Sequence, residues 1–474
     1  GRVPTAQQLT GDLSSLSSMI YDPLTTASDG SRSPFPGNII PVSRLDTGTQ
    51  KFAQYIPAAN LAQLINNSNI SVSPSAVADS NQTHFRVDHY LRSSDQIFAR
   101  WSYYDAPNTA PALAPLWGKE YPWTTYNGAI QETHIFGPGT LNEFRFGYSR
   151  DNIFQKAITE SGTNLAQAVG LKNTVPNAPD GGALPGVTVA GYNISGGSRP
   201  TGYISNRFQY SDVLSLTRGS HVIKVGADIR RLQYDVHSSN SPNGDIAFAK
   251  IFTTKTVGGS TGGDALADYL LGAFSTATGA RTVNSPAFRN STYNAFVQDE
   301  WKVTRRLHLS IGLRYEYAQK AYDVHNKIGI VDFSTGNLVF VRQNPFDPND
   351  TAVNPNVNRA LLDPDYNNFA PRFGFSFDAG KDTVIRGGFG IFYDVTQANE
   401  LNFLGFVPPY QTVISITNSP LAGVPSTYFS GLFPNAGAPN SIDPGTATFS
   451  HIASDRTPYV QQFNFNIQKR LFGD

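Results

Sequence analysis

The clearest pattern in this sequence is a strict alternation of apolar and polar residues between Arg306 and Gln319, which reads RLHLSIGLRYEYAQ. Apolar or aromatic residues occupy every second position from Leu307 to Tyr317, and mostly polar residues lie between them. A period of two predicts a β-strand with one apolar and one polar face. Its length of about eleven residues suits a tilted strand that crosses a membrane. Trp301 lies near the preceding turn, and aromatic residues at both ends of an apolar face are typical of two membrane interfaces.

The same alternation recurs in pairs of runs that are separated by short turns, such as Gly137–Thr140, so the sequence predicts a series of β-hairpins. A last unpaired run, with Phe463, Phe465 and Ile467 on one face, predicts one further strand. The eleven or so predicted strands are His84–Leu91, Gln96–Tyr104, Tyr126–Phe136, Leu141–Phe154, Asn206–Leu216, His221–Tyr234, Tyr293–Val303, Arg306–Gln319, Phe369–Phe377, Thr383–Tyr393 and Pro458–Leu471.

The connectors between hairpins are long and rich in Gly, Pro, Asn and Ser, although loops beyond about 12–15 residues are unusual in compact domains. Long loops that alternate with short turns are typical of bacterial outer-membrane β-barrels, in which the short turns are periplasmic. The turn at Thr304–Arg305 is therefore expected in the periplasm, and the segment Gly262–Gly272, whose spacing predicts a short helix, is expected outside. The long connectors are Asp105–Thr125, Gln155–Ser205, Asp235–Asn290, Lys320–Asn368 and Asp394–Thr457.

These patterns predict an all-β fold, an antiparallel transmembrane β-barrel with long extracellular loops. Single-chain bacterial barrels have even strand numbers and leave no open sheet edge in lipid. An odd count of about eleven strands therefore indicates part of a larger barrel. We expect residues 81–474 to form a partial transmembrane barrel and residues 1–80 to form a long extracellular loop segment. The chain is interpreted as cut at both ends, with the plug domain absent.

The composition of the chain bears on which molecules the protein binds and where in the cell it lies. Lys plus Arg number 36 and Asp plus Glu number 36, so there is no basic excess to bind nucleic acid. Charged residues make up 15% of the chain, below the roughly 25% of soluble domains. The absence of cysteine excludes disulfides, thiolate metal sites and a cysteine nucleophile. We expect a protein of the bacterial cell outer membrane, with outer-membrane lipid and not nucleic acid as a partner.

The stretch NAFVQDEWKVTRRLHLSIGLRYEY, Asn294–Tyr317, resembles the signature hairpin of TonB-dependent outer-membrane receptors. Other stretches are similar to the Oar-like subfamily, whose members contain a carboxypeptidase-regulatory-like domain. They occur in the family's order and cover most of the chain. These stretches are Pro4–Leu16, Phe35–Asp46, Gly263–Gly272, Asn367–Asp378, Val384–Asp394 and Thr457–Leu471.

The resemblance implies a barrel of about 22 strands with an N-terminal plug. It also implies a periplasmic segment that binds TonB, and energised uptake or surface binding of a bulky ligand. The sequence departs from the family in lacking a recognisable plug, Ton box and carboxypeptidase-regulatory-like domain. A TonB complex would therefore act through a segment missing from this chain.

Two sets of residues are candidates for function. Charged residues on the polar faces of the strands are expected to face the barrel lumen, where they would contact a plug or, less directly, a ligand. These lumen-facing candidates are Arg86, Asp88, Arg100, Arg145, Arg314, Glu316 and Arg386. Aromatic residues of the first long connector could stack on a ligand or pack the loops on each other, and the sequence favours neither role. These outer-loop candidates are Trp117, Tyr121 and Trp123.

No motif in the sequence predicts covalent chemistry. Gly258–Gly262 matches G-x-S-x-G, but it lacks the buried strand that precedes a nucleophile elbow, so a flexible Gly/Ser loop is favoured. The eight histidines show no H-x-x-x-H or H-E-x-x-H spacing, and the acidic loop Asp347–Asp350 lacks the pattern of a calcium loop. We expect no catalytic residues, no enzyme activity, no metal site and no cofactor.

The leading hypothesis is a TonB-dependent receptor that captures a bulky ligand at the cell surface for energised uptake. The ligand is left open among a siderophore, cobalamin, a glycan, a peptide and a protein. The alternative is a surface adhesion or structural protein that uses the barrel as an anchor and the loops as its working part.

Overall fold

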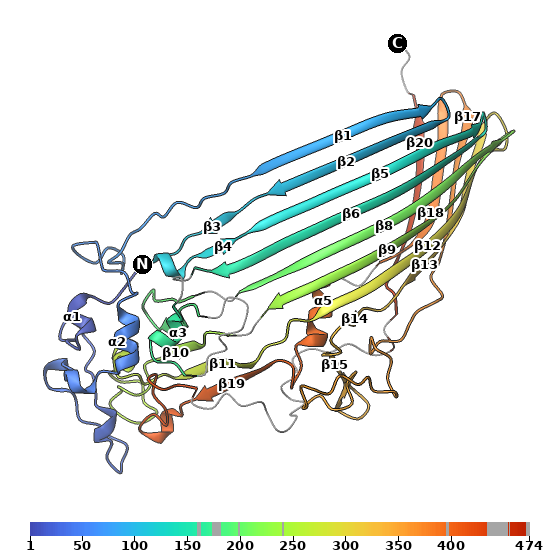
Figure 1. Ribbon diagram of the computed structural model, residues 1–474. Coiled ribbons are helices and arrows are strands. Elements are labelled where there is room, and N and C mark those ends of the chain that lie inside the picture. The colour runs from blue at the N-terminus through green and yellow to red at the C-terminus, as the bar shows by residue number, and fades with distance from the viewer. Residues whose placement is uncertain are drawn as a thin grey trace.

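The computed structural model describes residues 1–158, 163–172, 182–197, 200–238, 241–394, 398–433, 454 and 456–470. It divides visually into a long curved sheet, which we call the wall, and folded segments at one end of it, which we call the cap (Figure 1). The cap consists of the described residues of 1–80, 106–122, 163–197, 241–286, 319–368 and 398–433. The tight turns of the wall lie at the opposite end (Figure 1).

In the described part of the chain, the wall is an antiparallel sheet whose eleven long strands follow each other in chain order, and three short strands given below extend this sheet to fourteen. The predicted number and order of strands, and the predicted all-β antiparallel class, are confirmed. The strands in sheet order are β1 (Asn81–Arg92), β2 (Asp95–Asp105), β5 (Trp123–Gly137), β6 (Thr140–Ala157), β8 (Thr201–Arg218), β9 (His221–Ser238), β12 (Ala287–Lys302), β13 (Leu307–Ala318), β17 (Phe369–Gly380), β18 (Thr383–Tyr393) and β20 (Tyr459–Lys469).

The strand ends differ from the prediction in two ways. At four of the five tight turns one or both strands run further than expected, whereas β12 and β13 each stop one residue short of the predicted bound at their turn. Lys381 and Asp382 both adopt positive φ, as the two central residues of a type I′ hairpin turn do. At the cap end β6, β8 and β9 reach 18 residues each, beyond the roughly 9–11 that cross a membrane. Their outer parts belong to regions that the sequence analysis interpreted as loops. Leu471, the predicted end of the last strand, lies outside the described residues.

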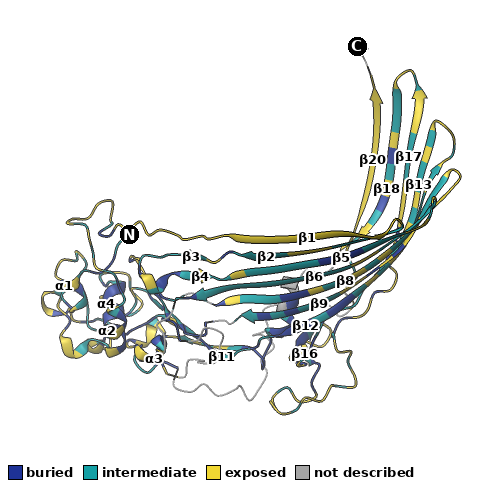
Figure 2. Cartoon of the chain, turned by 45° about the horizontal axis from the view of Figure 1, so that its top comes forward, coloured by how far each residue is buried: buried dark blue, intermediate teal, exposed yellow. Residues whose placement is uncertain are grey.

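The alternation of side chains gives the wall an apolar face and a polar face. Leu313 on β13 is the register partner of Val297 on β12, and the two side chains are 45% and 47% exposed. Arg314 and Phe296 form the next pair, on the polar face. The edge strands β1 and β20 are exposed along their whole length, as Figure 2 shows. The exposed rings and aliphatic side chains of the apolar face therefore have no layer of described residues over them.

The cap contains short helices and strands that the sequence analysis did not predict, apart from one. Four of its strands form a sheet in the order β19-β11-β10-β7, and only β10 and β7 in it are parallel. The helices are α1 (Ala6–Leu9), α2 (Thr47–Ala53), α3 (Leu165–Ala168), α4 (Ala265–Leu270) and α5 (Ala398–Gly405). The strands are β3 (Asn108–Ala110), β4 (Lys119–Tyr121), β7 (Gly186–Val189), β10 (Asp245–Phe248), β11 (Thr276–Thr282), β14 (Tyr322–Asp323), β15 (Gly329–Asp332), β16 (Asn337–Phe340) and β19 (Thr412–Thr417). Short 3₁₀ turns lie at Pro23–Thr25, Pro36–Asn38, Val42–Arg44, Pro115–Trp117 and Pro420–Ala422.

Helix α4 is the predicted short helix of the Gly262–Gly272 segment, and it lies at the centre of the cap. Asp264 caps its N-terminus by accepting a hydrogen bond from Leu266 N at 2.8 Å, and all six helical residues are buried. Tyr269 is fully buried and donates a hydrogen bond to the backbone of Thr49 in α2 at 2.7 Å. The N-terminal segment and the third long connector are thus packed into one core.

The interpretation of the long connectors as structureless loops is wrong for much of their described length. One hydrophobic core joins residues from the N-terminal segment with residues from four connectors, including Phe52, Leu165, Phe248 and Phe429. A second, smaller core joins residues 321–362 and 401–404 to the outer ends of β9 and β12. Within the described residues, no helix has the length and apolar character needed to cross a membrane.

Candidate functional site

The polar face of the wall brings together charged and amide side chains from neighbouring strands. Consecutive register partners place Arg145, Ser211, Asp228, Asn294 and Glu316 in one row across β6, β8, β9, β12 and β13. Asp228 accepts hydrogen bonds from Asn294 in this row and from Gln209, two residues before Ser211 on β8. Strand alternation therefore makes a continuous polar surface from residues that are far apart in the sequence.

A cavity of about 370 Å³ opens on this surface toward the cap end. Arg207 of β8, Arg314 of β13 and Tyr393 of β18 all line it, although β8 and β18 are not neighbours in the sheet. Because the wall curls across its width (Figure 1), such distant strands share a cavity only on the concave side, so the polar face is concave here. The other lining residues are Arg230, Leu232, Asn290, Thr292, Asn294, Glu316, Ala318, Asn368, Asp394 and Thr457.

The three arginines of this arginine-lined cavity differ in their partners. Arg314 Nε donates to Glu316 Oε1 at 2.5 Å, and Arg230 Nε donates to Asp228 Oδ1 at 2.7 Å. Arg207 is exposed, and its guanidinium has no hydrogen bond or ion pair with the described part of the chain. An unpaired guanidinium in a concave site is suited to bind a carboxylate or phosphate group.

A second cavity, of about 490 Å³, lies further toward the cap on the same sheet, between β6, β8, β9 and α5. Its lining is aromatic: Tyr121, Phe154, Tyr203 and Tyr234 contribute rings, with Phe403 and Phe406 from the α5 region. The rings of Tyr203 and Tyr234 lie 5.1 Å apart. The aromatic cavity and the arginine-lined cavity share strands β8 and β9, where Tyr203 and Arg207 are four residues apart.

The structure places two of the seven lumen-facing candidates, Arg314 and Glu316, in the arginine-lined cavity. Arg145 donates to Gln131 on the adjacent strand, below the cavity. The three candidates near the edge strand β1 form a group of their own, in which Arg86 pairs with Asp88 at 2.6 Å and Arg100 is the register partner of Arg86. Arg386 is exposed on β18, near the tight-turn end.

The three outer-loop aromatic candidates have different surroundings. Trp117 is only 4% exposed and belongs to the main core of the cap, which favours the packing role for its ring. Tyr121 lines the aromatic cavity and donates a hydrogen bond to Gln155 at 3.1 Å. Trp123 is 38% exposed and donates from its indole nitrogen to Thr125 at 3.1 Å.

Sequence reasoning missed Arg207 and Arg230, which the cavity places beside Arg314. Arg230 alternates with Asp228 on the polar face of a predicted strand, so the period of two could have identified it. Arg207 lies at the start of a predicted strand, and only the cross-strand register shows that it faces the same cavity.

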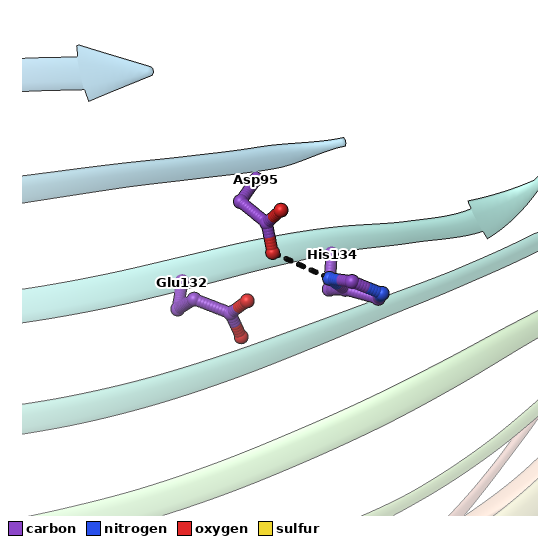
Figure 3. Close-up of side chains that lie close together, drawn as sticks. All are labelled: Asp95, Glu132 and His134. Atoms are coloured by element: carbon purple, nitrogen blue, oxygen red, sulfur yellow. Dashed lines mark hydrogen bonds and ion pairs between the residues drawn. The ribbon is translucent and has the colours of Figure 1, made fainter. Parts of the chain in front are cut away.

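On the apolar face, three side chains of metal-ligand type come together, namely Asp95, Glu132 and His134 (Figure 3). No metal site was expected from the sequence, because the histidine spacing and the acidic loop Asp347–Asp350 match no metal-binding motif. Asp95 and His134 are register partners on β2 and β5, so their proximity arises from strand pairing.

The chain is similar in fold to several solved structures of outer-membrane proteins. The outer membrane transporter YddB from Escherichia coli has 10% sequence identity and a TM-score of 0.44, with 84% of this chain and 38% of that one covered. The siderophore receptor PiuA from Acinetobacter baumannii has 12% identity and a TM-score of 0.40, with 83% and 48% covered. The chain thus spans less than half the length of these proteins. No functionally curated protein matches the sequence.

The match to a protein family is more decisive, because it extends over the whole chain. The family is described as "Outer membrane beta barrel domain", and residues 1–474 match it. This family accounts for the antiparallel sheet and for its uncovered apolar face, which contacts lipid. It also places the protein in the bacterial outer membrane. The chain belongs to the outer membrane β-barrel domain family.

Proposed function

We propose that this protein is a TonB-dependent receptor that captures a bulky ligand at the cell surface and takes it up in an energised step. In this proposal residues 81–474 form part of the transmembrane barrel, and residues 1–80 belong with the extracellular loops. The proposed partners are outer-membrane lipid, the TonB complex and the ligand. The stretch Asn294–Tyr317 supports the TonB-dependent receptor family, and Asn367–Asp378 and Val384–Asp394, among others, support the Oar-like subfamily as the finer assignment.

The observation that carries the proposal is the pair of cavities on the concave polar face. The aromatic cavity lies nearer the cap and offers rings on which a ligand could stack, and the arginine-lined cavity below it offers the unpaired guanidinium of Arg207. A ligand that enters from the cap end would meet the rings first and the positive charge second. This order favours a bulky ligand that carries a negatively charged group.

Uptake by the source bacterium tests the proposal. A deletion strain is complemented with the wild-type gene, with Arg207→Glu or with Arg386→Glu, and the uptake of labelled ferric siderophores, cobalamin and oligosaccharides is measured. We expect the deletion to abolish uptake of one ligand class, and Arg207→Glu to reduce it at least about tenfold. Arg386→Glu is the matched control, because Arg386 is exposed on the same face but does not line the cavity. Equal uptake by the deletion and wild-type strains for every class would refute the proposal.

A second candidate function, surface adhesion, is supported by the outer part of the cap. Residues 19–42 expose four large apolar side chains: Met19 at 49%, Leu24 at 59%, Ile39 at 48% and Val42 at 76%. Exposed apolar residues concentrated in one segment often mark a protein contact surface. If adhesion is the function, replacing these four residues with serine will reduce attachment to surfaces, while uptake of every labelled ligand stays unchanged.

A further inference from the structure

The cluster of Asp95, Glu132 and His134 lies on the lipid-facing side of the wall, at the tight-turn end. Ile130, which is 52% exposed on the apolar face, alternates along β5 with Glu132 and His134, so all three side chains point the same way. The register partners of Ile130 and His134 on β2 are Ala99 and Asp95, which places Asp95 on this face too. Tight turns of outer membrane barrels are periplasmic, so the cluster lies near the inner-leaflet headgroups.

Figure 3 shows the carboxylates of Asp95 and Glu132 directed toward the imidazole of His134. His134 Nδ1 lies 2.5 Å from Asp95 Oδ1, and one ligand-type atom from each of the three residues lies within 4.8 Å of the others. Ligand atoms around a tetrahedral Zn²⁺ ion are separated by roughly 3.4 Å, given bond lengths of about 2.1 Å. Small rotations of the side chains therefore suffice to place the three atoms around one ion.

The second oxygen of Asp95 is already oriented. Ser94 Oγ donates to Asp95 Oδ2 at 2.6 Å, which leaves Oδ1 directed toward His134. A hydrogen bond of this kind to the outer oxygen of a ligand is a common feature of protein metal sites. Arg92 is the register partner of Asp95 on β1 but makes no ion pair with it among the described residues.

Glu132 provides a separate reason to expect a cation. Its carboxylate has no hydrogen bond or ion pair with any described residue, and its register partners on both sides are the apolar residues Ile97 and Phe144. A carboxylate without a partner on a lipid-facing surface is costly unless a proton or a cation neutralises it. A metal cation, unlike a proton, needs several ligands, and the nearby pair of Asp95 and His134 supplies two of them.

We propose that Asp95, Glu132 and His134 bind a divalent transition-metal ion at the periplasmic rim of the wall, with Zn²⁺ as the representative ion. Two carboxylates and one imidazole suit Zn²⁺ better than Ca²⁺, which prefers a larger set of oxygen ligands. The three protein ligands leave one tetrahedral position open toward the headgroup layer. The ion joins β2 to β5, which are the second and third strands of the wall from the exposed edge strand β1.

The test measures Zn²⁺ binding by the full-length protein in detergent micelles, by competition with a coloured chelator. We expect saturable binding of one ion, tighter than roughly 100 µM, and weakening of at least about tenfold in Glu132→Gln. This substitution breaks no interaction among the described residues, so heat-modifiable gel migration should remain that of the wild type. Ca²⁺ is expected to compete weakly.

The wall itself provides a matched control in His221. Its Nδ1 lies 2.6 Å from Asp299 on the same face and at the same end, and its ring stacks on Trp301 at 5.1 Å. Among the described residues, no third side chain of metal-ligand type joins this pair. His221→Gln should therefore leave Zn²⁺ affinity unchanged. The absence of saturable Zn²⁺ binding in the wild type, or an equal loss in Glu132→Gln and His221→Gln, would overturn the proposal.

Discussion

The wall is held together by contacts between consecutive strands, whereas the cap is held together by contacts between residues far apart in the sequence. In the wall each strand pairs with the next long strand of the chain, and five of the ten pairings are hairpins closed by tight turns. In the cap, Asp46 accepts hydrogen bonds from the α2 backbone and from Ser430, which is 384 positions away. Arg32 donates to the carbonyl of Gly423 at 2.6 Å across a similar distance.

This difference has a consequence for stability. The wall is a ladder of backbone hydrogen bonds whose apolar side is stabilised by lipid, so the loss of one side chain leaves the ladder intact. The cap depends on a buried core that packs side chains of the small sheet β19-β11-β10-β7 against helices that no backbone ladder joins to it. We therefore expect substitutions in the cap core to open the cap without unfolding the wall.

The largest expected effect comes from truncating Phe248 in the cap core. Its ring is 1% exposed and packs edge to face on Tyr269 with 5.3 Å between centroids. Phe248→Ala should destabilise the cap by about 3–5 kcal/mol, because it leaves a cavity where β10 packs against α4. Hydrogen exchange of the α4 backbone should rise sharply, while heat-modifiable migration of the wall is retained.

The control for Phe248 is Phe463 of β20, which is 85% exposed on the apolar face. Phe463→Ala should leave exchange in α4 unchanged. If Phe248→Ala also removes the heat-modifiable form, the cap and the wall unfold as one unit, and the contrast between them is incorrect.

A smaller effect is expected from pH, through Asp268 of α4. Burial raises the pKa of this carboxyl to about 7, although it accepts hydrogen bonds from the backbone of Ile251, Phe252 and Thr253. Since the folded pKa exceeds the ordinary value of 3.8, the protonated form favours folding. The contribution of this carboxyl to the stability of the cap is fully present below pH 3.8 and is lost as the pH rises through 7.

The equilibrium constant for cap opening should therefore increase between pH 4 and pH 7. Because a single carboxyl group titrates, the increase is at most about tenfold per pH unit. Protease cleavage within residues 241–286, measured on the folded protein in micelles, follows the change. Asp268→Asn should lower protection at every pH, because its amide faces backbone donors, and should also flatten the slope. If protease cleavage of Asp268→Asn depends on pH as steeply as that of the wild type, another group causes the pH dependence.

The wall was predictable from sequence because its information is local. The period of two and the tight turns locate a strand such as Leu307–Ala318 within a few residues. The cap core was not predictable, because residues such as Phe52 and Phe429 lie in short apolar clusters that are hundreds of positions apart and share no period. Among the candidate sites, Arg314 and Glu316 followed from alternation alone.

The other site residues depend on register. The unpaired state of Arg207 depends on what lies opposite it on β6 and β9, and the cluster of Asp95 and His134 depends on a pairing between residues 39 positions apart. A sequence pattern assigns a side chain to a face of its strand, but it does not show which residues of the neighbouring strands lie beside it in the register. Cavities and metal clusters on a sheet are therefore seen only once the strands are aligned.

The smallest expected effect on stability separates two arginines of the same cavity. Arg230 neutralises Asp228, which is 8% exposed and would otherwise keep only Gln209 and Asn294 as partners. Arg230→Ala should therefore destabilise the wall by about 1 kcal/mol, a value kept low by the solvent exposure of the arginine. Arg207→Ala should change the free energy of unfolding by less than about 0.5 kcal/mol, because Arg207 has no partner among the described residues. Urea unfolding in lipid vesicles measures both values, and an equal loss in the two variants would mean that Arg207 has a structural role and is not free to bind a ligand.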